Sequence, residues 1–109
     1  HFDQAEELYQ ELLKNASTDS DRAFIYHQLG TLQHQQGKYP EAVKFYEKSL
    51  KVYEQIRSPN DPELASMYNN IGLAYKNMGE YLKALKYYEK ANKINQISLP
   101  PTHPQIATS

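Results

Sequence analysis

The chain has 109 residues, with 12 Lys and Arg against 13 Asp and Glu and a formal net charge of −1. This size predicts a single domain, and the near-zero charge argues against nucleic acid as a partner, because a nucleic-acid binder needs a basic face. The chain has no Cys, which excludes disulfides, thiolate metal sites and Cys nucleophiles and fits the cytoplasm. No apolar stretch approaches about 18 residues and no basic-then-apolar leader opens the chain, so we expect neither a membrane span nor a signal peptide.

The sequence repeats itself at an offset of 42 residues. All four glycines fall in register, Gly30 with Gly72 and Gly37 with Gly79. Aromatic, alanine, lysine and proline positions match as well: Ala23/Ala65, Tyr26/Tyr68, Tyr39/Tyr81, Ala42/Ala84, Lys44/Lys86, Tyr46/Tyr88 and Pro62/Pro104. Chance does not give this agreement, so we interpret the chain as tandem copies of one supersecondary unit.

In chain order, the pattern predicts two full repeats and two partial ones. Residues 1–17 copy the spacing of a second helix, because Phe2, Ala5, Tyr9 and Leu12 recur as Tyr39, Ala42, Tyr46 and Ser49. The first full repeat is expected at 20–60 and the second at 62–101. Residues 102–109 copy the opening of a repeat, so we expect about five helices, truncated at both ends.

Each full repeat is predicted to contain two helices. The core stripes recur at helical spacing: Tyr26, Leu29, Gln33, then Tyr39, Ala42, Val43, Tyr46, Leu50 in the first repeat, and Tyr68, Ile71, Tyr75, then Tyr81, Ala84, Leu85, Tyr88, Ala91 in the second. Gly37 and Gly79 should end the first helices, and Asp61 should cap the helix that Pro62 opens. Gly30 and Gly72 lie within helices, which indicates a close crossing opposite Ala42 and Ala84.

The sequence resembles the tetratricopeptide repeat in its spacing. Tyr26-x-x-Leu29-Gly30 and Tyr68-x-x-Ile71-Gly72, with the Gly, Tyr and Ala positions that follow, are similar to the signature of that family. The 42-residue period exceeds the family's usual value of about 34, and the Pro-containing connectors resemble the kinesin light chain type. The chain departs from the signature at two positions, with a glutamine for an aromatic residue at 33 and a serine for alanine at 49.

The resemblance implies an all-α fold, a right-handed superhelix of antiparallel helix pairs whose first helices line a concave groove. Such modules bind extended peptides or partner helices and have no chemistry of their own. In this family, Asn in the first helix contacts the ligand backbone, and the match carries this role to Asn69 and Asn70. The first repeat has His27 and Gln28 there. The alternative, an exposed face that tolerates two asparagines, stays open.

The charge pattern points to one side of the repeats. Residues 23–37 and 65–79 contain no Asp or Glu. We therefore predict a polar, acid-free and mildly basic groove wall, an acidic ligand, and an affinity that rises as histidine gains charge between about pH 7.5 and 6. The predicted groove residues are His27, Gln28, Thr31 and His34 in the first repeat and Asn69, Asn70, Leu73 and Lys76 in the second.

Other chemistry finds no support in the sequence. His27 and His34 are seven residues apart, whereas a metal pair prefers a spacing of three or four with further ligands. No phosphate-binding loop or nucleophile–His–acid set is present, and the lysines at 83–93 fit a solvated outer face. We predict no enzyme activity, no catalytic residues, no cofactor and no metal.

Two functions remain. The favoured hypothesis is a cytoplasmic protein-interaction module that binds a peptide or helix in the groove. The alternative is an architectural spacer, or a segment that self-associates through its exposed ends and positions a neighbouring domain in a larger protein.

Overall fold

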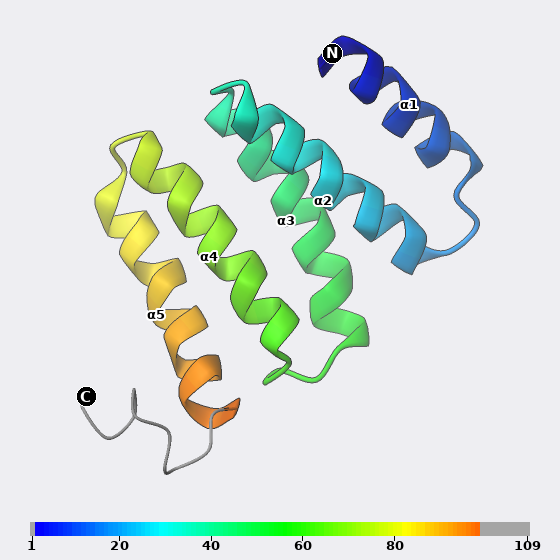
Figure 1. Ribbon diagram of the computed structural model, residues 1–109. Coiled ribbons are helices and arrows are strands. Elements are labelled where there is room, and N and C mark those ends of the chain that lie inside the picture. Colours follow the sequence, from blue (N-terminus) through cyan, green and yellow to red (C-terminus); the bar gives the residue numbers. More distant parts are fainter. Residues whose placement is uncertain (1, 99–109) are drawn as a thin grey trace.

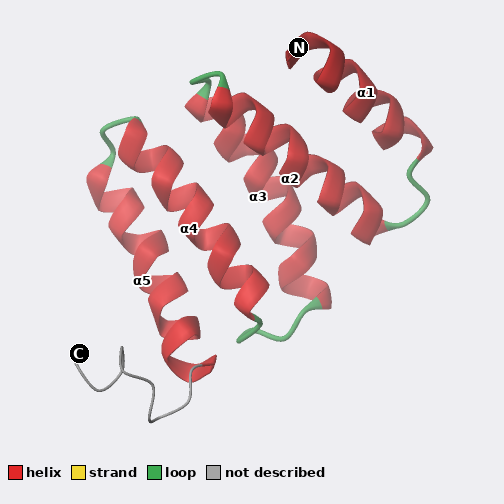
Figure 2. Ribbon diagram, in the orientation of Figure 1, coloured by secondary structure: helices red, strands yellow, loops and turns green. Residues whose placement is uncertain are grey.

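The computed structural model describes residues 2–98, which form five α-helices and no strand (Figures 1 and 2). The helices are α1 Phe2–Asn15, α2 Asp19–Gln35, α3 Tyr39–Ile56, α4 Pro62–Asn77 and α5 Tyr81–Ser98. Residues 99–109, which hold the end of the second predicted repeat and the expected start of another, lie outside the described residues. No helix of the described part is long and apolar enough to cross a membrane.

Local signals explain where the helices begin and end. The Asp61 carboxylate accepts a hydrogen bond from the Glu63 amide at 2.9 Å, as predicted for the cap of α4. The Thr18 hydroxyl accepts one from the Asp21 amide at 3.0 Å, so α2 begins at Asp19, one residue before the repeat predicted at 20–60. Gly37 and Gly79 follow α2 and α4 with φ of 78° and 79°, the left-handed conformation predicted there.

The helices pack in chain order, each against its neighbours in sequence. Figure 1 shows α2 with α3, and α4 with α5, as two helix pairs, with α1 against α2. The two pairs meet where α3 packs on α4. The continuous core spans α3, α4 and α5 and contains Ala42, Tyr46, Leu50, Leu64, Ala65, Met67, Tyr68, Ile71, Ala91 and Ile94.

The predicted close crossings are present in both pairs. A Cβ added at Gly30 would lie 3.2 Å from the Ala42 carbonyl oxygen but only 2.6 Å from the ring of Tyr46. At Gly72 the ring of Tyr88 is nearest, at 3.0 Å. The glycines therefore make room for a tyrosine ring, one turn beyond the alanines expected to face them.

The two departures from the family signature are both buried and hydrogen-bonded. The Ser49 hydroxyl is fully buried and donates to the Ala23 carbonyl at 2.7 Å, which joins α3 to α2. Gln33 is buried and its Nε2 lies 3.4 Å from a carboxylate oxygen of Glu6 on α1. Each polar substitution thus has a partner, as a buried polar group requires.

Two residues predicted to lie in the core are exposed instead. Tyr81 is 67% and Leu85 is 53% exposed, whereas Val43, the counterpart of Leu85, is buried. The reason is the number of neighbours: α3 packs on both α2 and α4, while α4 is the main described neighbour of α5. The core prediction was wrong at these two positions.

Candidate functional site

A pocket of about 210 Å³ lies where α2, the end of α3 and the beginning of α4 meet. It is thus built by two successive repeats, not by one. Its lining residues are Phe24 and His27 of α2, Tyr53 of α3, and Glu63, Ser66, Met67 and Asn70 of α4. Apolar side chains of three helices combine here with a few polar groups, which is the usual composition of a binding site. We call it the α2–α4 pocket.

His27 lines this pocket and has one ring nitrogen without a hydrogen-bond partner among the described residues. Its ring packs against Tyr46, with 5.4 Å between the ring centroids. Its Nδ1 is buried and has no hydrogen-bond partner among the described residues. Burial lowers the pKa of His27, and the charge of Glu63 offsets this only in part. A neutral ring can therefore offer one nitrogen as an acceptor to a ligand.

Thr31 and His34, which are also predicted groove residues of α2, lie against Tyr46. The Tyr46 hydroxyl lies 3.4 Å from the Thr31 hydroxyl. His34 packs edge-on against Tyr39, with centroids 5.1 Å apart, and its Nε2 lies 3.4 Å from the side-chain nitrogen of Asn77 on α4. Burial also lowers the pKa of His34, so both histidines gain charge at a lower pH than an exposed histidine does.

The two consecutive asparagines point to different places. Asn70 lines the α2–α4 pocket. Asn69 lines a separate hollow, together with Leu85, Tyr88 and Asn92 of α5. Consecutive residues of a helix are about 100° apart, so one repeat offers its two amides to two successive positions of the array.

Of the eight predicted groove residues, His27 and Asn70 thus share the α2–α4 pocket. Gln28, Leu73 and Lys76 lie outside it on α2 and α4. Leu73 is 40% exposed, Lys76 is exposed, and Gln28 is half-buried.

The prediction of an acid-free wall is wrong at the first helical turns. Because α4 begins at Pro62, Glu63 belongs to it and lines the pocket. Arg57 compensates this charge, with its Nη2 at 2.9 Å from the Glu63 carboxylate and its Nη1 at 3.7 Å from Asp61. The acid-free stretch begins only after this turn.

The sequence reading also missed the apolar part of the pocket. Phe24 is 56% exposed although it is a large hydrophobic residue, which is a signal for a binding surface. Phe24 and Ser66 occupy the same position of the two repeats, yet both line this pocket together with Tyr53 and Met67. Only the packing of one repeat on the next brings them together.

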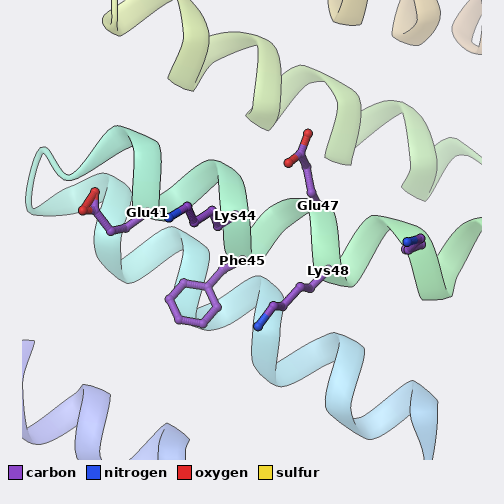
Figure 3. A pocket seen from close by; sticks show the side chains of 6 residues that line it. Glu41, Lys44, Phe45, Glu47 and Lys48 are labelled. Carbon is purple, nitrogen blue, oxygen red and sulfur yellow. The ribbon is translucent and has the colours of Figure 1, made fainter.

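A second hollow, of about 460 Å³, lies on the outer side of α3 (Figure 3). All of its lining residues come from α3, so no second helix encloses it. Figure 3 shows Phe45 and Lys48 directed toward α2, and the Lys48 ammonium lies 5.2 Å from the ring centroid of Tyr26. This is a charged surface in which a cation already rests on aromatic rings. A ligand would therefore find less enclosure and fewer free contact groups here than in the α2–α4 pocket.

Comparisons with known proteins agree with this architecture. A family model described as tetratricopeptide repeat matches residues 1–55 and 21–97. The chain belongs to the tetratricopeptide repeat family. No curated protein matches the chain.

Solved structures specify the type of tetratricopeptide repeat. BtubC (BKLC) from P. vanneervenii is similar over 98% of this chain and 44% of its own, with 25% identity and a TM-score of 0.78. A putative kinesin light chain with nearly identical TPR-like repeats from Podosopora anserina covers 98% of this chain and 51% of its own, with 18% identity and a TM-score of 0.80. The chain spans about half the length of these structures. The all-α, kinesin light chain-like fold predicted from sequence is confirmed. The family generally serves as a protein-interaction scaffold and is generally not catalytic.

Proposed function

We propose that this chain binds an extended peptide or a helix of a protein partner at the α2–α4 pocket. The observation that carries the proposal is the composition of the pocket, where apolar side chains from two repeats meet the polar side chains of His27, Ser66 and Asn70. The tetratricopeptide fold supports a protein as partner.

The lining residues suggest how a peptide is held. An apolar ligand side chain enters between Phe24, Tyr53 and Met67, because a space of about 210 Å³ accommodates one large side chain. The amide of Asn70 can donate to and accept from the ligand backbone. Neutral His27 can form one further hydrogen bond with the ligand backbone through a ring nitrogen.

The charges on α4 give the ligand a direction. Glu63 lies in the first turn of α4 and Lys76 in the last, on the same helix as Asn70. We propose that an acidic residue or a terminal carboxylate of the ligand lies toward Lys76 and His34, away from Glu63. Opposite charges at close range favour this orientation. Changing Lys76→Glu should then weaken acidic ligands selectively.

Adjacent asparagines supply a matched test. Peptides selected from a displayed library against the full chain are measured for affinity with Asn70→Ala and Asn69→Ala variants. We expect the Asn70 change to weaken binding about fivefold and the Asn69 change to have little effect, since a lost hydrogen bond costs about 1 kcal/mol. Equal affinities in both variants, with helicity unchanged, would reject the pocket.

The alternative function is architectural. In that case the chain serves as a spacer or as a self-associating segment that positions a neighbouring domain. The regular packing of the helices in chain order supports a role as a spacer. For either function we propose a cytoplasmic location, which the lack of Cys supports.

A further inference from the structure

A guanidinium of the chain itself lies against two residues that line the α2–α4 pocket. Arg57 directly follows α3, in the connector that leads to α4, and its Nη2 lies 2.9 Å from the Glu63 carboxylate. Its guanidinium carbon lies 5.4 Å from the ring centroid of Tyr53. A carboxylate beside an aromatic face is a favourable environment for an Arg or Lys side chain. The structure thus shows that a cation fits against these two residues.

Both partners of this guanidinium also face the pocket. Tyr53 and Glu63 line it, and Arg57 contacts them from beside it. Burial raises the pKa of Tyr53, the charge of Glu63 raises it further, and the charge of Arg57 lowers it. Burial lowers the pKa of His27 on α2, and the charge of Glu63 opposes this shift. The Glu63 carboxylate is therefore close enough to attract a cation that a ligand brings to the pocket.

The contact between Arg57 and Glu63 is accessible and exchangeable. The Glu63 side chain is 60% exposed, and an ion pair in contact with water contributes little to stability. Arg57 has a second partner in Asp61, whose carboxylate lies 3.7 Å from its Nη1. Arg57 can therefore give up Glu63 and keep an acidic neighbour.

The position of Glu63 suits a ligand residue next to the apolar anchor. The pocket holds about one large side chain, which the anchor fills. Glu63 lies in the first turn of α4 and stays largely exposed, so a neighbouring ligand side chain can reach it from solvent. The long apolar stem of Arg or Lys allows its charged end to reach such a carboxylate.

We propose that the α2–α4 pocket selects a basic ligand residue at Glu63, and that Arg57 is an internal competitor of this residue. The inference rests on the proposed function of the pocket. The ligand then carries an acidic residue toward Lys76, the apolar anchor in the pocket, and an Arg or Lys toward Glu63. Whether the ligand cation replaces Arg57 or shares the carboxylate with it, the two like charges repel each other. Arg57 therefore lowers the affinity for the ligand that Glu63 attracts.

Removal of the competitor should strengthen binding. A peptide selected from a displayed library against the full chain is synthesised with Arg or with citrulline, at each of the two positions next to the anchor on the side away from the acidic residue. Citrulline has the shape of arginine without its charge. We expect the wild-type chain to bind the better Arg peptide about twofold more tightly than its citrulline partner. Arg57→Gln should raise the affinity for that Arg peptide about threefold and leave the citrulline peptide unchanged.

Two further variants identify the carboxylate and control for the lost charge. Glu63→Gln should abolish the preference for Arg over citrulline, and Arg57→Gln should then have no further effect. Arg22→Gln is the matched control, because Arg22 is the chain's other arginine and is also paired with a nearby acid, Asp19. It should leave both affinities unchanged. High salt should reduce the preference for Arg, since the charges are exposed.

The outcomes separate this inference from the function on which it rests. The inference is overturned if Arg57→Gln fails to raise the affinity for the Arg peptide, raises both peptides equally, or has the same effect as Arg22→Gln. If Asn70→Ala still weakens both peptides in that case, the pocket binds them without selecting a base. If none of the changes at Asn70, Glu63 and Arg57 alters binding, both proposals are rejected. Circular dichroism of each variant verifies that the helices are retained.

Discussion

The junction between α3 and α4 differs from the junction between α1 and α2, although both join a second helix to the next first helix. At the α3–α4 junction, Tyr46 and Leu50 are buried, and the Tyr68 hydroxyl donates to the Glu54 carboxylate at 2.7 Å. At the α1–α2 junction no residue of α1 is buried, and the polar contact between Gln33 and Glu6 spans 3.4 Å.

This difference indicates which junction contributes most to the stability of the array. The candidate site lies at the same junction. In a solenoid, stability is approximately a sum of repeat terms and neighbour interfaces, so a well-packed junction dominates. The α2–α4 pocket forms at the well-packed junction, and α1 contributes nothing to it. The candidate pocket thus lies at the junction where the described helices are well packed.

Leucine truncation at equivalent positions should show the largest contrast. Leu50→Ala removes a side chain from the continuous core and should cost about 2–4 kcal/mol of unfolding free energy. Leu13 occupies the matching position of α1 and is half-buried. Leu13→Ala should therefore cost less than half as much unfolding free energy. Chemical denaturation of both variants measures this. Equal losses of unfolding free energy would show that the two junctions are equally well packed.

Replacing each of the two crossing glycines by alanine should affect the stability of the two helix pairs differently. A Cβ at Gly30 would lie 2.6 Å from the Tyr46 ring, so Gly30→Ala should destabilise the chain by about 1–3 kcal/mol. At Gly72 the Tyr88 ring is 3.0 Å away and Tyr88 is only half-buried, so a small shift relieves the contact. The Ala84 carbonyl oxygen stays 3.2 Å from the new Cβ, but the helix propensity of alanine offsets part of the cost, so Gly72→Ala should lose less stability than Gly30→Ala. Thermal unfolding compares the pair, and the reverse order of stabilities would refute the crossing geometry.

Removal of one hydroxyl should give a smaller effect. Tyr68→Phe loses the hydrogen bond to Glu54 and should cost about 1 kcal/mol. Burial and this carboxylate raise the pKa of Tyr68 to about 12, so the hydroxyl remains a donor at neutral pH. Tyr26→Phe is the control, because Tyr26 occupies the same position in the first repeat and its ring stacks on Phe45. Equal losses for the two variants would show that the bond does not stabilise the junction.

Acid should weaken the chain slightly through its histidines. Burial lowers the pKa of His27 and His34 in the folded state, so the unfolded chain binds more protons as the pH falls below the ordinary value of about 6.5. Stability is therefore complete above that value and declines below it. The double change His27→Asn and His34→Asn should reduce this decline, measured as the melting temperature between pH 7.5 and 5. If the double variant loses as much stability at low pH as the wild-type chain, other titratable groups cause the loss.

Much of the fold could be predicted because it depends on local signals. Gly37 and Gly79 have the expected positive φ, and Asp61 and Pro62 begin α4 as expected. These features follow from backbone geometry within a few residues, which a sequence displays directly.

The site was less predictable because it depends on packing between repeats. Asn69 and Asn70 are neighbours in sequence, yet they line different hollows. Met67 and Tyr53 have no polar signal and become lining residues only when α4 docks on α3. The lowered pKa values of the histidines likewise result from burial, which helical periodicity alone does not report.

Mapping of a bound peptide by NMR tests the central claim most directly, namely that the junction of α2, α3 and α4 is the binding site. A peptide selected against the full chain is titrated into the labelled protein, and shifts of backbone and side-chain amides are followed. We predict the largest shifts at Phe24, His27, Met67 and the Asn70 side chain, with small changes at Asn69. Shifts concentrated at Lys44 and Lys48 on the outer side of α3 would contradict the account.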